Sequence, residues 1–260
     1  MPYIDVENSR VHYLHKPGGP RPVVFLHGGF GSSAELWEGT MARLPAACSG
    51  YAIDNFLRSD APPGGYNIAA FARRAGAFVQ ALGLPRAVFV GHSMGGVTCQ
   101  LTALDYPEVV GALVLVCTGP TMPNPEVGRV LLDQLKAKGH EIGTLREISA
   151  EWFRVPPAGF FEGYVQRAAQ APLGAMVAVQ QSLIDIDLTA RLPEITVPAL
   201  VVHGQHDRGR TIEHARRLVA GITGSRLAVM AHSGHTPMIE TPADFDAAFH
   251  AFLATPATLA

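Results

Sequence analysis

A serine enclosed by glycines is the residue whose surroundings indicate chemistry most clearly. The segment Gly91-His92-Ser93-Met94-Gly95 follows a short apolar run and precedes an apolar stretch with helical spacing. In a tight turn between a strand and a helix, a serine hydroxyl stands at the helix N-terminus, where free N–H groups and the helix dipole favour a developing negative charge. Flanking glycines leave room for the strained backbone of such a turn. We therefore predict that Ser93 is a nucleophile rather than part of a Gly-Ser turn without function.

A nucleophilic serine needs a base that takes its proton. His235 lies in the loop between the last strand-like run and the final helical pattern, and Gly234 leaves that loop free to direct the ring. His232, in the same loop, is the competing candidate. His203 ends a strand-like run and is expected to be structural, and His250 lies within a helical pattern. These positions favour His235 as the base.

The base in turn needs a carboxylate that fixes its tautomer and stabilises the imidazolium. Asp207 follows the strand-like run that ends at His203 and precedes the next helical pattern. Asp185 and Asp187 come before that run and are weaker candidates. A loop aspartate on its own is typical of a solvated turn, but one in register with the serine and the histidine predicts the third member of a triad.

Two backbone N–H groups must bind the oxyanion that forms when a serine attacks a carbonyl. The N–H of Met94, directly after the nucleophile, is the first candidate. The second is expected from the glycine-rich turn at residues 27–31. Gly29 is favoured there, with Phe30 as the alternative, because the glycines leave the register of the turn open.

The hydrophobic pattern predicts the elements that position these residues. Helical spacing occurs at residues 68–82, where Asn67 is placed to cap the helix. An alternating stretch at residues 3–14 predicts a hairpin at one sheet edge. Strands alternating with helices predict an α/β fold with a mostly parallel, doubly wound sheet. The nearly continuous apolar runs, typical of strands covered on both faces, are residues 22–26, 50–54, 87–90, 112–117, 199–203 and 227–230.

One long segment departs from this alternation. Residues 119–192 contain no convincing strand, include several prolines, and show helical spacing near residues 127–135 and 175–184. A segment of this length between two core strands is more typical of an inserted subdomain than of a loop. We predict a core of residues 1–118 and 193–260, with residues 119–192 as an inserted helical cap.

The overall composition excludes some classes of partner. The 260 residues are 48% apolar and 16% charged, with a formal net charge of −2, which gives no electrostatic case for nucleic acid or an anionic membrane surface. Cys48, Cys99 and Cys117 lie in apolar contexts without metal-ligand spacing and are predicted to be buried thiols. The sequence suggests no secretory or membrane-spanning segment, which favours a cytoplasmic protein. We expect no metal or other cofactor, and a homodimer is compatible with the sequence.

Four motifs in order resemble those of the α/β-hydrolase superfamily over almost the whole chain. They are HGGFGSS at 27–33, GHSMGG at 91–96, HGQHD at 203–207 and SGHTPMIETP at 233–242. The resemblance implies the α/β-hydrolase fold, a cap over the site, and a triad in the order serine, aspartate, histidine. Within the superfamily the chain most resembles 3-oxoadipate enol-lactonases and small bacterial esterases. Glu151-Trp152-Phe153, for example, is similar to a cap segment of the lactonases.

The chain departs from the lactonase pattern at three places. It has His92-Ser93-Met94 where the lactonases usually have Leu-Ser-Leu, and its loop at residues 54–59 is shortened and lacks glycines. Asp207 is followed by the basic segment Arg208-Gly209-Arg210. The two arginines suggest a cationic rim that attracts an anionic substrate. The more ordinary interpretation is a pair of solvated loop arginines.

The sequence as a whole predicts hydrolysis of a small-molecule carboxylic ester or lactone through an acyl-enzyme on Ser93. A serine nucleophile disfavours dehalogenase and epoxide hydrolase chemistry, which the related enzymes perform with a carboxylate. Carbon–carbon hydrolysis of a vinylogous diketone is the enzymatic alternative, and a ligand receptor with a vestigial triad is the alternative of another class. Five cap aromatics are candidates for the substrate pocket, although packing within the cap would explain each equally well: Trp152, Phe153, Phe160, Phe161 and Tyr164.

Overall fold

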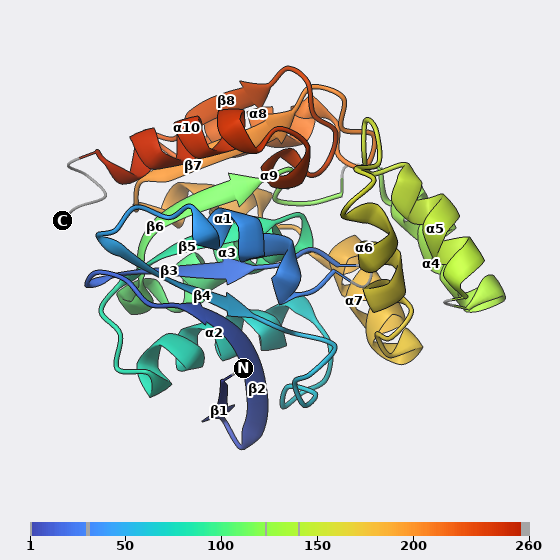
Figure 1. Cartoon of the computed structure of the whole chain (residues 1–260), viewed down its shortest axis with the longest axis horizontal. Coiled ribbons are helices and arrows are strands. Elements are labelled where there is room, and N and C mark those ends of the chain that lie inside the picture. The colour runs from blue at the N-terminus through green and yellow to red at the C-terminus, as the bar shows by residue number, and fades with distance from the viewer. Residues whose placement is uncertain (1, 30–31, 123, 140, 256–260) are drawn as a thin grey trace.

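The computed structural model describes residues 2–29, 32–122, 124–139 and 141–255. Within these residues the chain forms an eight-stranded sheet in the order β1-β2-β4-β3-β5-β6-β7-β8 (Figure 1). The strands β3 to β8 all run parallel to one another. The strands are β1 Tyr3–Val6, β2 Ser9–Lys16, β3 Arg21–Leu26, β4 Cys48–Ile53, β5 Ala87–His92, β6 Val110–Val116, β7 Ala199–Gly204 and β8 Arg226–Met230.

The first two strands form an antiparallel edge of the sheet. A two-residue turn, Glu7 and Asn8, joins β1 to β2, and its φ angles are 51° and 63°. Positive φ at both residues gives a turn whose twist matches that of the flanking strands. β2 then runs antiparallel to β4. The hairpin predicted at residues 3–14 is therefore confirmed.

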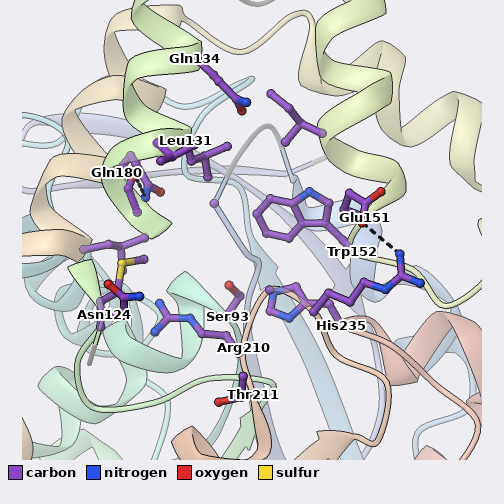
Figure 2. A pocket seen from close by; sticks show the side chains of 18 of the residues that line it. Ser93, Asn124, Leu131, Gln134, Glu151, Trp152, Gln180, Arg210, Thr211 and His235 are labelled. Atoms are coloured by element: carbon purple, nitrogen blue, oxygen red, sulfur yellow. Dashed lines mark hydrogen bonds and ion pairs between the residues drawn. The ribbon is translucent and has the colours of Figure 1, made fainter. Parts of the chain in front are cut away.

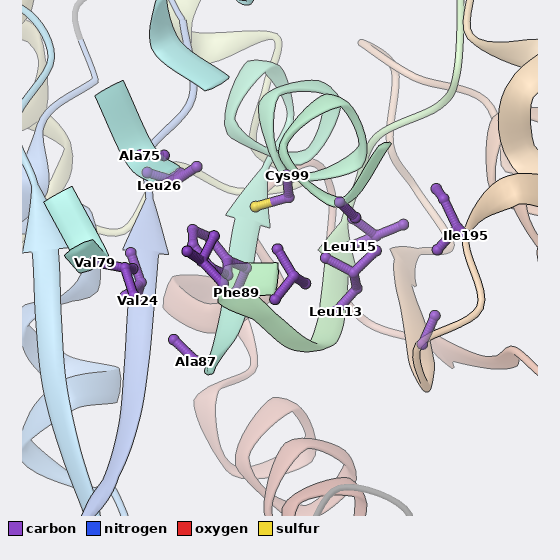
Figure 3. Packing of buried hydrophobic residues seen from close by; sticks show 14 of the residues in the cluster. Val24, Leu26, Ala75, Val79, Ala87, Phe89, Cys99, Leu113, Leu115 and Ile195 are labelled. Carbon is purple, nitrogen blue, oxygen red and sulfur yellow. The ribbon is translucent and has the colours of Figure 1, made fainter. Parts of the chain in front are cut away.

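Helices cover both faces of the sheet, as its apolar strands require. The helices are α1 Glu38–Ala42, α2 Ile68–Ala81, α3 Met94–Asp105, α4 Pro125–Lys138, α5 Ile142–Ala150, α6 Phe161–Ala168, α7 Leu173–Asp185, α8 Ile212–Gly221, α9 Pro237–Glu240 and α10 Pro242–Leu253, with short 3-10 segments at Ala34–Trp37, Pro107–Val109 and Thr189–Glu194. Val24 and Leu26 of β3 pack in one layer with α2 and α3 (Figure 3), and the same apolar cluster includes residues of α8. Val23 and Phe25 pack in the opposite layer with α1 and α10. The predicted doubly wound α/β sheet is confirmed.

Four helices, α4 to α7, fill the segment between β6 and β7 and lie beyond the carboxyl ends of the strands (Figure 1). Their inner side chains, Met176 and Val179 among them, share an apolar cluster with Val97 of α3. Thr121 and Asp187 form an isolated antiparallel bridge near the two ends of the segment. These helices and the segments that connect them will be called the cap. The division of the chain after residues 118 and 192 stays a prediction.

Two smaller predictions are also confirmed. The side chain of Asn67 caps α2, accepting a hydrogen bond from the Ala70 N–H at 2.8 Å. Cys48, Cys99 and Cys117 are buried and unbridged. Across the described part of the chain, no helix has the length and apolar character that crossing a membrane would require.

Candidate active site

Ser93 lies in the turn between β5 and α3, at the carboxyl edge of the sheet. Its φ and ψ are 52° and −114°, and positive φ is strained for a residue that carries a side chain. The Ser93 N–H donates to the carbonyl of Val116 in the neighbouring strand β6 at 2.9 Å. The Ser93 carbonyl accepts a hydrogen bond from the Thr118 hydroxyl at 2.7 Å. The backbone of the predicted nucleophile is thus fixed on both sides.

Gly91 and Gly95 allow backbone contacts that a side chain would prevent. A Cβ added at Gly95 would lie 2.3 Å from the carbonyl oxygen of Leu26 in β3. A Cβ added at Gly91 would lie 2.3 Å from the carbonyl oxygen of Gly95. Both neighbours are backbone atoms, which cannot rotate away. The two glycines therefore let α3 begin directly against β3 and β5, and this places Ser93 at the strand ends.

Asp207 and His235 come from the loops after β7 and β8, and the structure brings them together. His235 Nδ1 lies 2.7 Å from Asp207 Oδ2, and both side chains are buried. The other carboxylate oxygen accepts the backbone N–H of Arg210 at 2.8 Å. A proton on Nδ1 leaves Nε2 of the uncharged ring as an acceptor. Nε2 has no hydrogen-bond partner among the described residues, so it is available for a proton from the nucleophile.

Asp207 is ionised despite its burial. Burial raises the pKa of this carboxyl, but its interactions with His235, followed by those with His203 and the Arg210 N–H, outweigh that effect. The net pKa of Asp207 therefore lies below its ordinary value. A carboxylate at neutral pH is what stabilises an imidazolium on the base.

Ser93, His235 and Gly29 line one cavity of about 820 Å³. Figure 2 shows the Ser93 hydroxyl and the His235 ring facing this space, with the Trp152 indole above them in that view. Nε2 and the hydroxyl are not hydrogen-bonded in this structure. Such catalytic hydrogen bonds are often long without substrate and tighten when it binds.

Met94 and Gly29, the two predicted oxyanion donors, lie beside each other. Met94 is the first residue of α3, so its N–H has no carbonyl within the helix to bind. A Cβ added at Gly29 would lie 3.6 Å from the Met94 Cβ. The alternative donor, Phe30, lies outside the described residues.

His27 holds the turn that carries Gly29, a role that sequence reasoning did not assign. Its Nε2 accepts the Asn55 N–H at 2.9 Å, so the proton lies on Nδ1, which donates to Gly28 O at 2.7 Å. Burial lowers the pKa of His27, and only the uncharged ring can accept on one side and donate on the other. The only sequence signal for this role was the position of His27 as the first residue of the HGGF motif.

His92, the residue before Ser93, holds the loop of His235. Its Nε2 donates to the His235 carbonyl at 2.8 Å, and the two ring centroids are 4.7 Å apart. Burial, and next the charge of His235, lower the pKa of His92 to about 3. His232, the competing candidate for the base, lies exposed beside Arg154. His203 is buried, and its Nε2 donates to the Arg210 carbonyl at 2.9 Å.

Glu240, at the end of α9, ties the histidine loop to the cap, and sequence reasoning missed it. Its carboxylate accepts the N–H groups of Gly234 and Thr236, each at 3.1 Å. It also accepts the N–H of Arg154 in the cap at 2.7 Å. The His235 N–H donates to the cap carbonyl of Trp152, again at 2.7 Å. The position of His235 therefore depends on both parts of the chain.

The structure divides the five cap aromatics into two groups. Trp152 lines the cavity, and its ring lies 5.2 Å from that of His235. The other four are not among the described residues on the cavity wall. Phe153, Phe161 and Tyr164 are buried and Phe160 is partly buried, and these four rings pack on one another with centroids 5.6 to 6.3 Å apart.

Arg208 and Arg210 both line the cavity but lie in opposite environments. The Arg208 side chain is 67% exposed and pairs with Glu151 at 3.0 Å. Arg210 is only 5% exposed. The prediction of two solvated arginines is therefore right for Arg208 and wrong for Arg210, which the loop turns inward beside Asp207.

One group of side chains within the described residues has the spacing of metal ligands. Donor atoms of Cys117, His203 and Asp207 lie within 4.8 Å of one another. Burial raises the pKa of the Cys117 thiol well above its ordinary value, so this group stays protonated. Asp207 already accepts hydrogen bonds from His235 and Arg210. This donor set does not favour a metal ion.

Comparisons with known proteins agree with this geometry. Residues 23–248 match the model of a family described as "Alpha/beta hydrolase family". A 2-hydroxy-6-oxo-6-phenylhexa-2,4-dienoate hydrolase of Comamonas testosteroni is 30% identical, over 93% of this chain and 90% of the relative. A putative carbamate hydrolase, RutD, of Stutzerimonas stutzeri is 26% identical, over 91% of this chain and 94% of the relative.

The fold is also similar to that of solved structures. The crystal structure of the enol-lactonase from Burkholderia xenovorans aligns with a TM-score of 0.86 and 23% sequence identity. The alignment covers 98% of this chain and 100% of the lactonase. At this identity the likeness concerns the arrangement of the chain, including the cap, and leaves the substrate open.

Proposed function

The chain belongs to the alpha/beta hydrolase family, and from that premise we propose that it cleaves a small carboxylic ester or lactone through an acyl-enzyme on Ser93. One observation carries the proposal. Asp207 and His235 are joined, and the unpartnered Nε2 of His235 belongs to the same cavity wall as the Ser93 hydroxyl. A serine facing an oriented base has the arrangement needed for attack on a carbonyl carbon.

In the acylation half-reaction, the Ser93 oxygen bonds to the substrate carbonyl carbon while its proton passes to His235 Nε2. The carbonyl oxygen becomes an oxyanion, which accepts hydrogen bonds from the N–H groups of Met94 and Gly29. Asp207 stabilises the imidazolium. The carbon–oxygen bond to the alcohol then breaks, and the alcohol takes the proton from His235. In a lactone this alcohol stays attached to the acyl chain.

Deacylation repeats these steps with water. His235 takes a proton from water, and the hydroxide oxygen bonds to the acyl carbon. The oxyanion forms again beside Met94 and Gly29. When the bond to Ser93 breaks, the serine oxygen recovers its proton from His235, and the carboxylic acid leaves. The cycle consumes one water molecule and needs no further reactant.

Carbon–carbon hydrolysis is the second candidate, favoured by the 30% identity to the Comamonas hydrolase. In that reaction water is added across a bond between a carbonyl carbon and an enol-stabilised carbon. The same triad and oxyanion donors would serve, so the substrate distinguishes the two functions. The acyl transfer to Ser93 would equally accept a carbamate, as the name of the Stutzerimonas relative suggests.

The test combines labelling with turnover. A fluorophosphonate probe is expected to label the wild-type protein and to leave Ser93→Ala unlabelled. Ser93→Ala and His235→Gln are expected to lose at least about a thousandfold in kcat on p-nitrophenyl esters or lactones. His232→Gln is the matched control and is expected to keep its kcat within about twofold, because that ring is exposed and outside the triad.

Three outcomes would change the proposal. Turnover of 2-hydroxy-6-oxo-6-phenylhexa-2,4-dienoate far above that of any ester or lactone would move carbon–carbon hydrolysis to first place. Preferred turnover of a carbamate would change the acyl group and keep the nucleophile. No labelling and no turnover, together with strong stabilisation by a small ligand, would replace the enzyme with a receptor built on the same fold.

A further inference from the structure

Arg210 stands out on the wall of the active-site cavity. Among the described residues on that wall, it is the one charged side chain that is buried. The other charged residues of the wall are exposed: Lys138, Glu147, Glu151, Arg208, Glu213 and Arg217. A buried cation is costly unless an anion or several acceptors replace its water. Burial of Arg210 is therefore expected to be compensated by a group of opposite charge.

The described part of the protein supplies little of this compensation. One guanidinium N–H donates to the carbonyl of Thr121 at 3.2 Å, and within the described residues the side chain makes no ion pair. The carboxylate of Asp207 binds the catalytic histidine and the backbone N–H of Arg210, not its guanidinium. Two acids of the cavity wall, Glu151 and Glu213, pair with exposed arginines instead.

The guanidinium keeps its charge in this setting. Burial lowers the pKa of Arg210 to about 10, against the opposing effect of the Asp207 charge, so the group is cationic at neutral pH. His214 lies close by on the same wall. Burial and the Arg210 charge lower the pKa of His214 to about 4, so that ring is uncharged. A permanent cation thus borders the space that Ser93 faces.

We propose that the substrate carries a carboxylate besides the bond that is cleaved, and that this carboxylate binds the guanidinium of Arg210. The inference rests on the proposed function, because it places a second group of the same substrate in the same cavity. The planar guanidinium presents paired N–H donors that match the two oxygens of one carboxylate. Figure 2 shows Arg210 and Ser93 bordering the same space, with the arginine side chain directed towards Asn124 in that view.

A carboxylate matches the donor geometry of this site. A single guanidinium can satisfy both of its oxygens at once. Thr121 O takes only one of the guanidinium N–H groups, which leaves donors for a bidentate ligand. Arg208 is a matched contrast two residues away, because its charge is solvated and paired with Glu151.

The first experiment compares two substrates of equal chain length, p-nitrophenyl hydrogen adipate and p-nitrophenyl hexanoate. Wild-type protein is expected to prefer the adipate ester in kcat/KM. Arg210→Met is expected to lower the adipate-to-hexanoate ratio about 10- to 100-fold, because it removes a charge-assisted hydrogen-bonded pair. Arg210→Lys should fall between, and Arg208→Gln should keep the ratio within about twofold. If Arg210→Met leaves the adipate-to-hexanoate ratio of kcat/KM unchanged, even through an equal loss on both esters, the proposal is overturned.

The second experiment needs neither turnover nor a substitution of Arg210. Ser93→Ala is titrated by calorimetry with adipate and with adipamide, which has the same shape but no charge. Tighter binding of adipate, by about tenfold or more, supports the anion site even if no ester is ever turned over. Equal binding of the two ligands, with esters still hydrolysed by the wild type, would refute the anion site and leave the proposed function standing.

Discussion

The loops at the carboxyl edge of the sheet and the cap face the same cavity but are built differently. The core loops hold Ser93 in strained geometry and keep Asp207 and His235 buried and hydrogen-bonded. The cap contributes side chains from α4, α5 and α7, and its charged wall residues are exposed, as Glu147 and Glu151 are. The core loops therefore supply Ser93, Asp207 and His235, whereas the cap shapes the cavity and adds backbone contacts that hold the His235 loop.

Glycine-to-alanine substitutions should give the largest difference in unfolding free energy between the core and the cap. Gly95→Ala is expected to lose about 3 kcal/mol or more of unfolding free energy, because the new Cβ would overlap the Leu26 carbonyl oxygen. Gly174→Ala, in cap helix α7, is expected to gain about 0.5 kcal/mol, because the added Cβ would meet no described atom within 4 Å outside its own stretch of helix and alanine favours a helix. Denaturant unfolding measures both. Equal stability of Gly95→Ala and wild type would contradict the tight core.

The same contrast decides what could be predicted from the sequence. The turn of Ser93 needs glycines at fixed spacing and a strand before it, so the short segment 91–95 is enough to predict the role of Ser93. In the cap, the sequence shows which residues are apolar, but not whether an apolar side chain faces the cavity or the cap's own interior. Trp152 and Phe153 are adjacent in sequence, yet only the first lines the cavity among the described residues.

Arg210 and Glu240 show a second reason for missed assignments. Arg208 and Arg210 differ by two positions in a loop with no periodicity, so burial of one and exposure of the other follow from tertiary contacts alone. Glu240 acts on backbone N–H groups of residues 154, 234 and 236. A sequence pattern does not show which backbone N–H groups a side chain binds, although Glu240 lies within the SGHTPMIETP motif.

The pH dependence of stability should originate in the core through His92. Its pKa is about 3 in the folded protein and about 6.5 in an unfolded chain. Below pH 6.5 the unfolded state therefore binds a proton that the folded state does not, so stability falls as the pH is lowered towards 3. From pH 7 to pH 5 this one group should cost about 2 kcal/mol.

Denaturant unfolding of His92→Gln at the two pH values tests that origin. The variant is expected to lose less stability between pH 7 and pH 5 than the wild type, by about 2 kcal/mol. Glu147→Gln, an exposed change in the cap, is expected to leave the wild-type difference intact. An identical pH difference in His92→Gln and the wild type would show that the proton uptake lies elsewhere.

Glu240→Gln should disturb the contact through which the cap positions His235, the proposed base. The neutral amide weakens the charge-assisted hydrogen bonds from the Gly234, Thr236 and Arg154 N–H groups. We expect kcat on a p-nitrophenyl ester to fall about tenfold with KM within about twofold, because a misplaced base affects the chemical step. A change in KM alone would instead assign Glu240 to the shape of the cavity.

The smallest effect is expected where the two regions meet at the surface. Arg208, from the core loop, and Glu151, from the cap, lie 3.0 Å apart, with side chains 67% and 69% exposed. Exposed ion pairs contribute little, because water and salt screen the charges and both side chains lose rotamer freedom. A double-mutant cycle with Arg208→Gln and Glu151→Gln should give a coupling energy below about 1 kcal/mol that declines further in 0.5 M salt. A coupling of several kcal/mol would mean that this pair, and not the backbone contacts at His235 and Glu240, joins the cap to the catalytic loops.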